Sequence, residues 1–238
     1  MQDENRDFDL HRQLDAWAAG QANAGSSPEL ARKVRDALKP SLTPVKPIFS
    51  RRRLFLMFLA VFVAGSAGLV AFMSRIGLRL MTPIQIGGIS AILAGVGILF
   101  AVKLAEQMIP GSRPGIPLWG LLTLGGVAAF VGLATLFPWQ ASGNFVSEGW
   151  PCAVMELTIV IPVTAVFWVL ARRGALFASA GLGATLTGLA AFLVLIPLQF
   201  QCMFQQAPHL LVWHGGTALL IIGLGAFVGD LRCGRRSS

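Results

Sequence analysis

The sequence predicts an all-α, polytopic membrane protein with six transmembrane helices and a short cytoplasmic amino-terminal tail of amphipathic helices. Apolar residues make up 55% of the 238 residues and charged residues only 13%, about half the charged share of a soluble domain. The charges lie outside a few long apolar runs, and nearly all Lys and Arg residues fall on one side of those runs. These observations define the class, since length alone allows one domain or two.

Six apolar stretches are long enough to cross a bilayer, because about 20 helical residues span roughly 30 Å of hydrocarbon. Four of them carry no ionisable residue, while the fourth stretch contains Glu156 and the sixth contains His214. Short connections predict that consecutive helices are antiparallel neighbours. The expected spans are residues 54–73, 83–102, 116–137, 152–171, 175–198 and 210–229, which form a transmembrane domain of residues 54–229.

The distribution of Lys and Arg predicts that both termini are cytoplasmic. With the amino terminus inside, only Arg75 and Arg79 of the 19 Lys and Arg residues lie outside. Cytoplasmic loops carry such an excess of positive residues in membrane proteins. The formal charge of +8 therefore does not indicate nucleic-acid binding, since no basic face with aromatic stacking residues accompanies it.

Small residues inside the spans predict close helix packing. The segment GLGAFVG at residues 223–229 superficially resembles a dinucleotide fingerprint, but no strand precedes it and it lies within an uncharged span. We therefore expect no cofactor there. Packing through small residues is expected at Gly225, Gly229, Gly181, Gly183, Thr185 and Gly188.

The predicted tail, residues 1–53, contains two short amphipathic patterns. The second begins with Ser27 as a cap and Pro28 at the first helical position, and it stops at Pro40. Helices of about ten residues are marginal in isolation. Two interpretations stay open: the helices lie on the membrane surface, or they fold into the groove of a cytoplasmic partner. The tail is too short for an enzyme core, and the other cytoplasmic segment, residues 230–238, is short and basic.

Two of the three cysteines are predicted to lie at one membrane face. Cys152 and Cys202 fall at the outer ends of the fourth and fifth spans, whereas Cys233 falls on the cytoplasmic side. The outer pair could form a disulfide if the two Cα atoms come within about 7 Å. It could also capture a soft metal ion transiently through two thiolates.

Three further residues are expected to support a sensing site at this pair. Glu156 lies one helical turn below Cys152, and His209 and His214 open the sixth span on the same side. A carboxylate inside a span is expensive and tends to be functional. A structural disulfide beside ordinary interface residues remains the alternative, and the spacing matches no standard zinc motif. No Ser-His-Asp order, paired carboxylates or phosphate loop is present, so we expect no enzyme and no cofactor.

Several segments together resemble the NrsF family of bacterial transmembrane anti-sigma factors, the negative regulators of sigma-F-type extracytoplasmic-function sigma factors. The resemblance covers about residues 28–236, and the Gln-rich loop after Cys202 departs from it. The matching features are the tail LARKVRDALKPSLTPVKP leading to RRRL, the turns at Pro110-Gly111 and Arg172 to Gly174, the cysteine segments GWPC and QCMF, and the pair Trp213-His214.

The resemblance implies a non-enzymatic signalling protein of the bacterial inner membrane. Its tail would hold an extracytoplasmic-function sigma factor away from RNA polymerase, and Cys152 and Cys202 would release it under heavy-metal or oxidative stress. The implied sigma-binding segment runs from Leu30 to Lys46, with apolar positions at Leu30, Val34, Ala37, Leu38 and Leu42.

Two alternatives belong to other classes. A small transporter or permease would use Glu156, His209 and His214 to line a path, and would need internal repeats or broken helices near the membrane centre. A membrane assembly protein would have no sigma-factor partner.

Overall fold

Helices make up the regular structure of this protein wherever the chain is described. The computed structural model describes residues 49–73, 75–109, 115–140, 143–172 and 179–234, together with Arg32 and Asp36. The chain divides into two units, residues 1–47 and 48–238. Of the first unit only Arg32 and Asp36 are described, and both are helical. The tail residues predicted to bind a partner, Leu30, Val34, Ala37, Leu38 and Leu42, lie outside the described residues.

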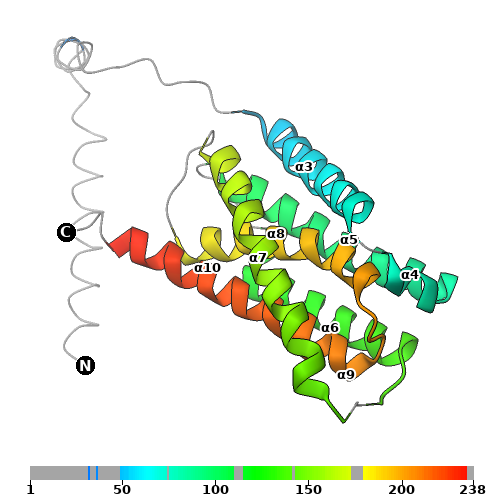
Figure 1. Ribbon diagram of the computed structural model, residues 1–238. Coiled ribbons are helices and arrows are strands. Elements are labelled where there is room, and N and C mark those ends of the chain that lie inside the picture. The colour runs from blue at the N-terminus through cyan, green and yellow to red at the C-terminus, as the bar shows by residue number, and fades with distance from the viewer. Residues whose placement is uncertain are drawn as a thin grey trace. The chain divides into compact units, whose positions relative to one another are not determined.

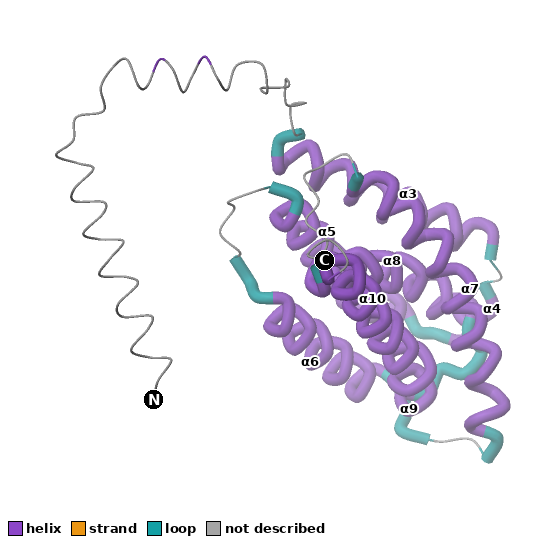
Figure 2. The backbone as a smooth tube through the Cα atoms, turned by 90° about the vertical axis from the view of Figure 1, so that its left-hand side faces the viewer, coloured by secondary structure: helices purple, strands orange, loops and turns teal. Residues whose placement is uncertain are grey.

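The second unit is a bundle of six long helices (Figure 1 and Figure 2). All six are long and apolar enough to cross a membrane, and the described residues contain no strand, which confirms the predicted fold class. A short helix, α4 (Ile76–Leu80), follows the first of them. The long helices are α3 (Arg51–Phe72), α5 (Pro83–Gln107), α6 (Leu118–Leu136), α7 (Phe145–Ala171), α8 (Ala180–Gln201), and a run formed by α9 (Ala207–His209), the π-helix η2 (Leu210–Gly215) and α10 (Gly216–Gly234).

Helix α8 lies at the centre of the bundle and packs against α3, α4, α5, α7 and α10. In the most apolar 18-residue stretch of α8, 72% of the residues are buried, compared with 22% in the corresponding stretches of α3, α6 and α7. Small side chains permit this burial, as predicted. A Cβ atom at Gly183 would overlap the carbonyl oxygen of Gly225, and one at Gly229 would overlap that of Ser179. The predicted close packing through glycine is therefore confirmed between α8 and α10.

Helix α3 docks onto α8 at the point where a proline interrupts the hydrogen bonds of α8. Pro197 has no N–H to donate to the carbonyl oxygen of Leu193, four residues earlier. The hydroxyl group of Ser66, which is buried in α3, donates to that oxygen at 3.1 Å instead. In hydrocarbon a backbone group without a partner is costly, so this bond offsets the proline and fixes the contact between the two helices.

Two helices extend beyond the predicted spans, and in each the added part includes a glutamate. Helix α5 continues to Gln107 rather than ending at residue 102, since Glu106 pairs with Lys103 at 3.7 Å and also with Arg51 of α3. Helix α7 begins at Phe145 rather than at residue 152. Its first turn contains Glu148, which the helix dipole favours there.

The other spans shift by a few residues. Helix α8 runs from Ala180 to Gln201 rather than over residues 175–198, and the Ser179 hydroxyl caps it by accepting from the Leu182 N–H at 3.1 Å. Helix α3 begins at Arg51, where Ser50 is the cap. The sixth span begins at Ala207 and contains a π-helical segment that the sequence analysis did not predict.

Replacing Ser66 by Ala should lower the free energy of unfolding of the detergent-solubilised protein by about 1 kcal/mol, because the Leu193 carbonyl loses its donor. In a Pro197→Ala background the new N–H of residue 197 can donate to Leu193, so the same change should cost much less. Thermal or denaturant unfolding of the four proteins measures this coupling. An equal cost in both backgrounds would contradict the assigned role of Ser66.

Candidate functional site

Four side chains with sulfur or nitrogen donor atoms meet at one end of the bundle. Cys152 lies in α7, Cys202 directly follows α8, His209 ends α9, and His214 lies in η2. One sulfur or ring-nitrogen atom from each of the four residues lies within 4.8 Å of the corresponding atoms of the other three. Cys202, His209 and His214 are buried and Cys152 is half-buried, so Cys152 is the most accessible of the four.

Cys202 makes the closest contacts within this cluster. Its Sγ atom lies 3.5 Å from Nε2 of His209, and its thiol donates to the carbonyl oxygen of Phe204 at 3.6 Å. Both Cys152 and Cys202 are free thiols. The interaction with the Cys152 sulfur raises the pKa of the Cys202 thiol, and burial raises it further.

A glutamine network fixes the turn that carries Cys202. The side-chain amide of Gln205 donates to the carbonyl oxygen of Cys202 at 2.6 Å and to that of Gln199 at 3.1 Å. The Gln199 amide in turn donates to the Gln205 side-chain oxygen at 2.9 Å. These bonds satisfy carbonyl groups at the end of α8, where the helix offers no donors of its own. The Gln-rich loop, for which the sequence analysis gave no role, thus orients Cys202.

The π-helix η2 brings the two histidines together. In an α-helix of 3.6 residues per turn, residues five apart point about 140° away from each other. In a π-helix residues five apart are joined by a backbone hydrogen bond and lie on the same face. His209 and His214 are five apart, and their ring centroids lie 5.8 Å from each other. Single-turn π segments in α-helices are frequent at functional sites.

Aromatic side chains enclose the histidines on the side of α7. The His209 ring contacts Phe204, with centroids 5.2 Å apart, and Phe145, with centroids 6.4 Å apart. Trp213 contacts Phe145 and lies directly over Gly149, where any Cβ atom would overlap its indole ring. Phe145 and Gly149 of α7 therefore pack closely against His209 and Trp213.

Several buried polar atoms around the cluster have no hydrogen-bond partner among the described residues. They include both ring nitrogens of His214 and Nδ1 of His209. Buried polar groups nearly always have a partner, so each such atom requires an explanation, for example an ion or a water molecule.

Glu156 is fully buried one turn of α7 from Cys152, but it lies outside the group of four donors. Neither of its carboxylate oxygens has a hydrogen-bond partner among the described residues. The structure thus places Glu156 one helical turn from the cluster, and its predicted support of the site stays a prediction.

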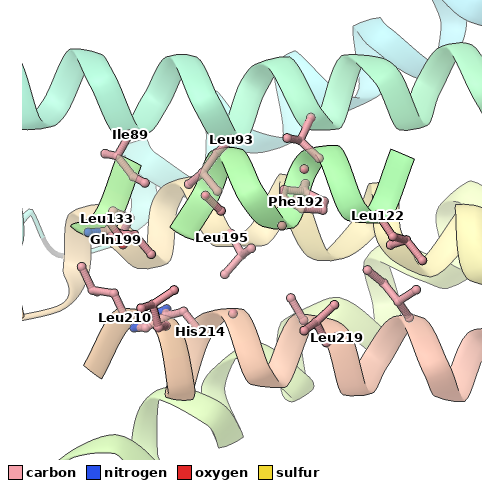
Figure 3. Close-up of a pocket in the computed structure, with 18 of the residues that line it drawn as sticks. Ile89, Leu93, Leu122, Leu133, Phe192, Leu195, Gln199, Leu210, His214 and Leu219 are labelled. Atoms are coloured by element: carbon pink, nitrogen blue, oxygen red, sulfur yellow. The ribbon is translucent and has the colours of Figure 1, made fainter. Parts of the chain in front are cut away.

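An apolar cavity of about 150 Å³ lies between α5, α6, α8 and α10, and it borders the site. Its lining is almost entirely aliphatic and aromatic, apart from Gln199 and His214. Figure 3 shows these two side chains at the same end of the cavity, near Leu210. The His214 side chain therefore borders this cavity as well as the donor cluster.

Comparison with known proteins identifies the family of the chain. A family model described as NrsF, negative regulator of sigma F, matches residues 38–232. The chain belongs to this family. The matched region contains all six long helices almost completely, along with both cysteines and both histidines of the cluster. No curated protein and no solved structure matches the chain.

Membership makes the protein a negative regulator of a sigma factor, so a sigma factor is its partner. The family role is regulatory rather than catalytic. The match begins at residue 38, inside the predicted sigma-binding segment, and thus includes Leu38 and Leu42 but not Leu30 or Val34.

Replacing Gln205 by Met should make Cys202 react about tenfold faster with a maleimide, because the turn loses hydrogen bonds worth about 1.4 kcal/mol together. Gln206→Met is the matched control, since the Gln206 side chain makes no capping bond. Mass spectrometry of the labelled Cys202 peptide, in the reduced full-length protein, measures both rates. Equal rates for the two variants would show that the Gln205 network does not restrain Cys202.

Proposed function

We propose that this protein holds an extracytoplasmic-function sigma factor at the bacterial inner membrane through its cytoplasmic tail. It releases the sigma factor when Cys152 and Cys202 react with a heavy metal or an oxidant on the outer side. The family assignment supports the regulatory half of this proposal. The observation that supports the sensing half is the proximity of two free thiols from α7 and from the end of α8.

The positions of the cysteines and of the tail suit transmission across a membrane. The tail joins α3 at Arg51, and α3 has 22 residues, so its ends are about 33 Å apart. After α3 the chain continues into α4, whose Gly77 lies against the Cys202 carbonyl oxygen. The sensor cysteines thus lie near one end of α3 and the tail leaves from the other.

The charges of the described residues support the orientation with the tail inside. Arg51, Arg52, Arg53 and Lys103 lie at the end of the bundle where the tail begins, and Arg172 follows α7 at that end. At the end of the bundle that contains the cysteines, the only Lys or Arg residues in the sequence are Arg75 and Arg79. This excess of positive charge is typical of the cytoplasmic side.

Helix α8 offers a mechanical connection between sensor and tail. Cys202 ends α8, and α8 is bonded to α3 through Ser66 and the Leu193 carbonyl. Arg51 is the first residue of α3, at the end of the bundle where the tail begins. Its guanidinium group forms an ion pair with the Glu106 carboxylate of α5. A shift of the α8 end would therefore act on α3, and α3 is continuous with the tail.

The chemistry at the cysteines can supply enough free energy for a switch. Converting a population that is 99% bound into one that is 99% released requires about 5.5 kcal/mol of differential stabilisation. Metal binding to good sites with thiolate ligands releases about 10 kcal/mol or more. Disulfide formation removes two electrons and two protons from the two thiols, which an oxidant takes up, and closes a covalent bond between α7 and α8.

The double variant Cys152→Ser, Cys202→Ser should still repress the sigma-dependent promoter but no longer respond to cadmium or to a thiol oxidant. A reporter gene under that promoter measures both properties. The Cys233→Ser variant is the matched control and should respond as the unmodified protein does. A normal response of the double variant would refute the sensing half of the proposal.

Replacing Leu38 by Asp should abolish co-purification of the sigma factor with the full-length protein, because a charge disrupts an apolar helix–groove contact. The same substitution at Leu10, in the stretch of the tail before the proposed binding segment, should leave co-purification unchanged. Retention of the sigma factor by the Leu38 variant would place the binding surface elsewhere.

A further inference from the structure

The four donor atoms at the site have the chemical composition of a closed metal centre. Two cysteine sulfurs and two histidine nitrogens are the ligands of many tetrahedral zinc sites. With Zn–S distances of about 2.3 Å and Zn–N distances of about 2.0 Å, a sulfur and a nitrogen ligand lie about 3.5 Å apart. The observed distance from Cys202 Sγ to His209 Nε2 is 3.5 Å. All donor pairs lie within 4.8 Å, so small side-chain movements would complete the tetrahedron.

The backbone supports a role of the histidines as ligands. The π-helical turn η2 places His209 and His214, five residues apart, on one face beside the cysteines. A plain α-helix would direct one of the two rings about 140° away. The two rings are 1% and 3% exposed, and three of their four nitrogens have no hydrogen-bond partner among the described residues. A metal ion would provide a partner for one of the two free ring nitrogens of His214.

Charge balance selects the class of ion. Binding of a divalent ion displaces one proton from each thiol, and two thiolates with two neutral imidazoles then make an uncharged complex. A monovalent ion would leave one net negative charge in a buried site, which is costly in an apolar surrounding. Two thiolate and two imidazole ligands favour ions of borderline to soft character and exclude magnesium and calcium.

We propose that Cys152, Cys202, His209 and His214 together bind one divalent, tetrahedral ion of the zinc and cadmium class. This inference rests on the proposed function in that it specifies the signal read by the same cysteines. It adds both histidines as ligands, and it makes metal binding, rather than closure of a disulfide, the event at the site.

Titration of the reduced, metal-free full-length protein in detergent with cobalt(II) tests the proposal directly. We expect one cobalt per chain, the intense visible bands of tetrahedral cobalt, and a thiolate-to-cobalt charge-transfer band in the ultraviolet. Zinc and cadmium should displace the cobalt. Six-coordinate cobalt with weak visible bands, or no saturable binding, would overturn the proposal.

Single substitutions identify the ligands. Cys152→Ser, Cys202→Ser, His209→Ala and His214→Ala should each weaken binding by more than about 100-fold, because even partners of metal ligands contribute 10–100-fold. His11→Ala and Cys233→Ser are the matched controls and should bind as the unmodified protein does. If both histidine variants bind cobalt normally, the four-ligand site is wrong.

A variant that replaces one metal ligand by another tests the site even if the alanine variants misfold. His214→Cys keeps a metal ligand at the position and should increase the thiolate-to-cobalt charge-transfer band by about half, from two thiolates to three, since each thiolate contributes to it. It should also shift the preference towards cadmium, the softer ion. An unchanged spectrum of this variant would exclude residue 214 from the coordination sphere.

The promoter assay separates failure of this inference from failure of the proposed function. If the double cysteine variant loses the response to cadmium while both histidine variants keep it, the cysteines sense without the histidines, and the metal centre is refuted alone. If cobalt binds through all four ligands but the double cysteine variant responds normally, the sensing function is refuted and the metal centre stands.

Discussion

The burial of α8 among apolar helices is the constraint on which the rest of this structure depends. A helix at the centre of a membrane bundle has neither water nor lipid to satisfy a free backbone group, so each interruption needs a protein partner. Glycines let α10 approach the backbone of α8, and Ser66 of α3 satisfies the carbonyl that Pro197 leaves free. The same helix leads directly into Cys202, so the most constrained element of the bundle also positions one thiol of the cluster.

The polar groups of the bundle are concentrated at its two ends. At one end Arg51, Lys103 and Glu106 form a partly buried ion-pair cluster at the root of the tail. At the other end two thiols and two imidazoles are packed together with few partners of their own. The segment between them is apolar, with α8 and α3 as continuous rigid elements. An arrangement of this kind allows an event at one face to be felt at the other through helix movement rather than through passage of a solute.

The incomplete hydrogen bonding at the cysteine cluster is informative about its use. A structural core would pair its histidine nitrogens or replace them by apolar groups, because unpaired buried polar atoms destabilise a fold. Unpaired histidine nitrogens beside two free thiols are typical of a site where a bound ligand provides the missing partners. The Gln199–Gln205 network and the aromatic enclosure hold the donors in place, which lowers the entropy that binding has to overcome.

Much of the candidate site could be predicted because topology fixes membrane depth. The number and direction of the spans bring Cys152 and Cys202 to one face, and the same argument places Glu156, His209 and His214 near them. The helix ends were less predictable. Glu148 and Glu106 lie inside helices, beyond the predicted spans, where a helix dipole and an ion pair stabilise them.

The sequence by itself determined the fold class, the six spans and the face shared by the cysteines, because hydrophobic length and the distribution of charge act locally along the chain. Only the tertiary structure decided that the two histidines share a helix face with each other and a site with the cysteines. Helical periodicity assigns residues five apart to different faces, and the π-helical turn that overrides this forms in contact with α7 and α6. The partner of the Leu193 carbonyl was also beyond prediction, since Ser66 lies 127 residues away in the chain.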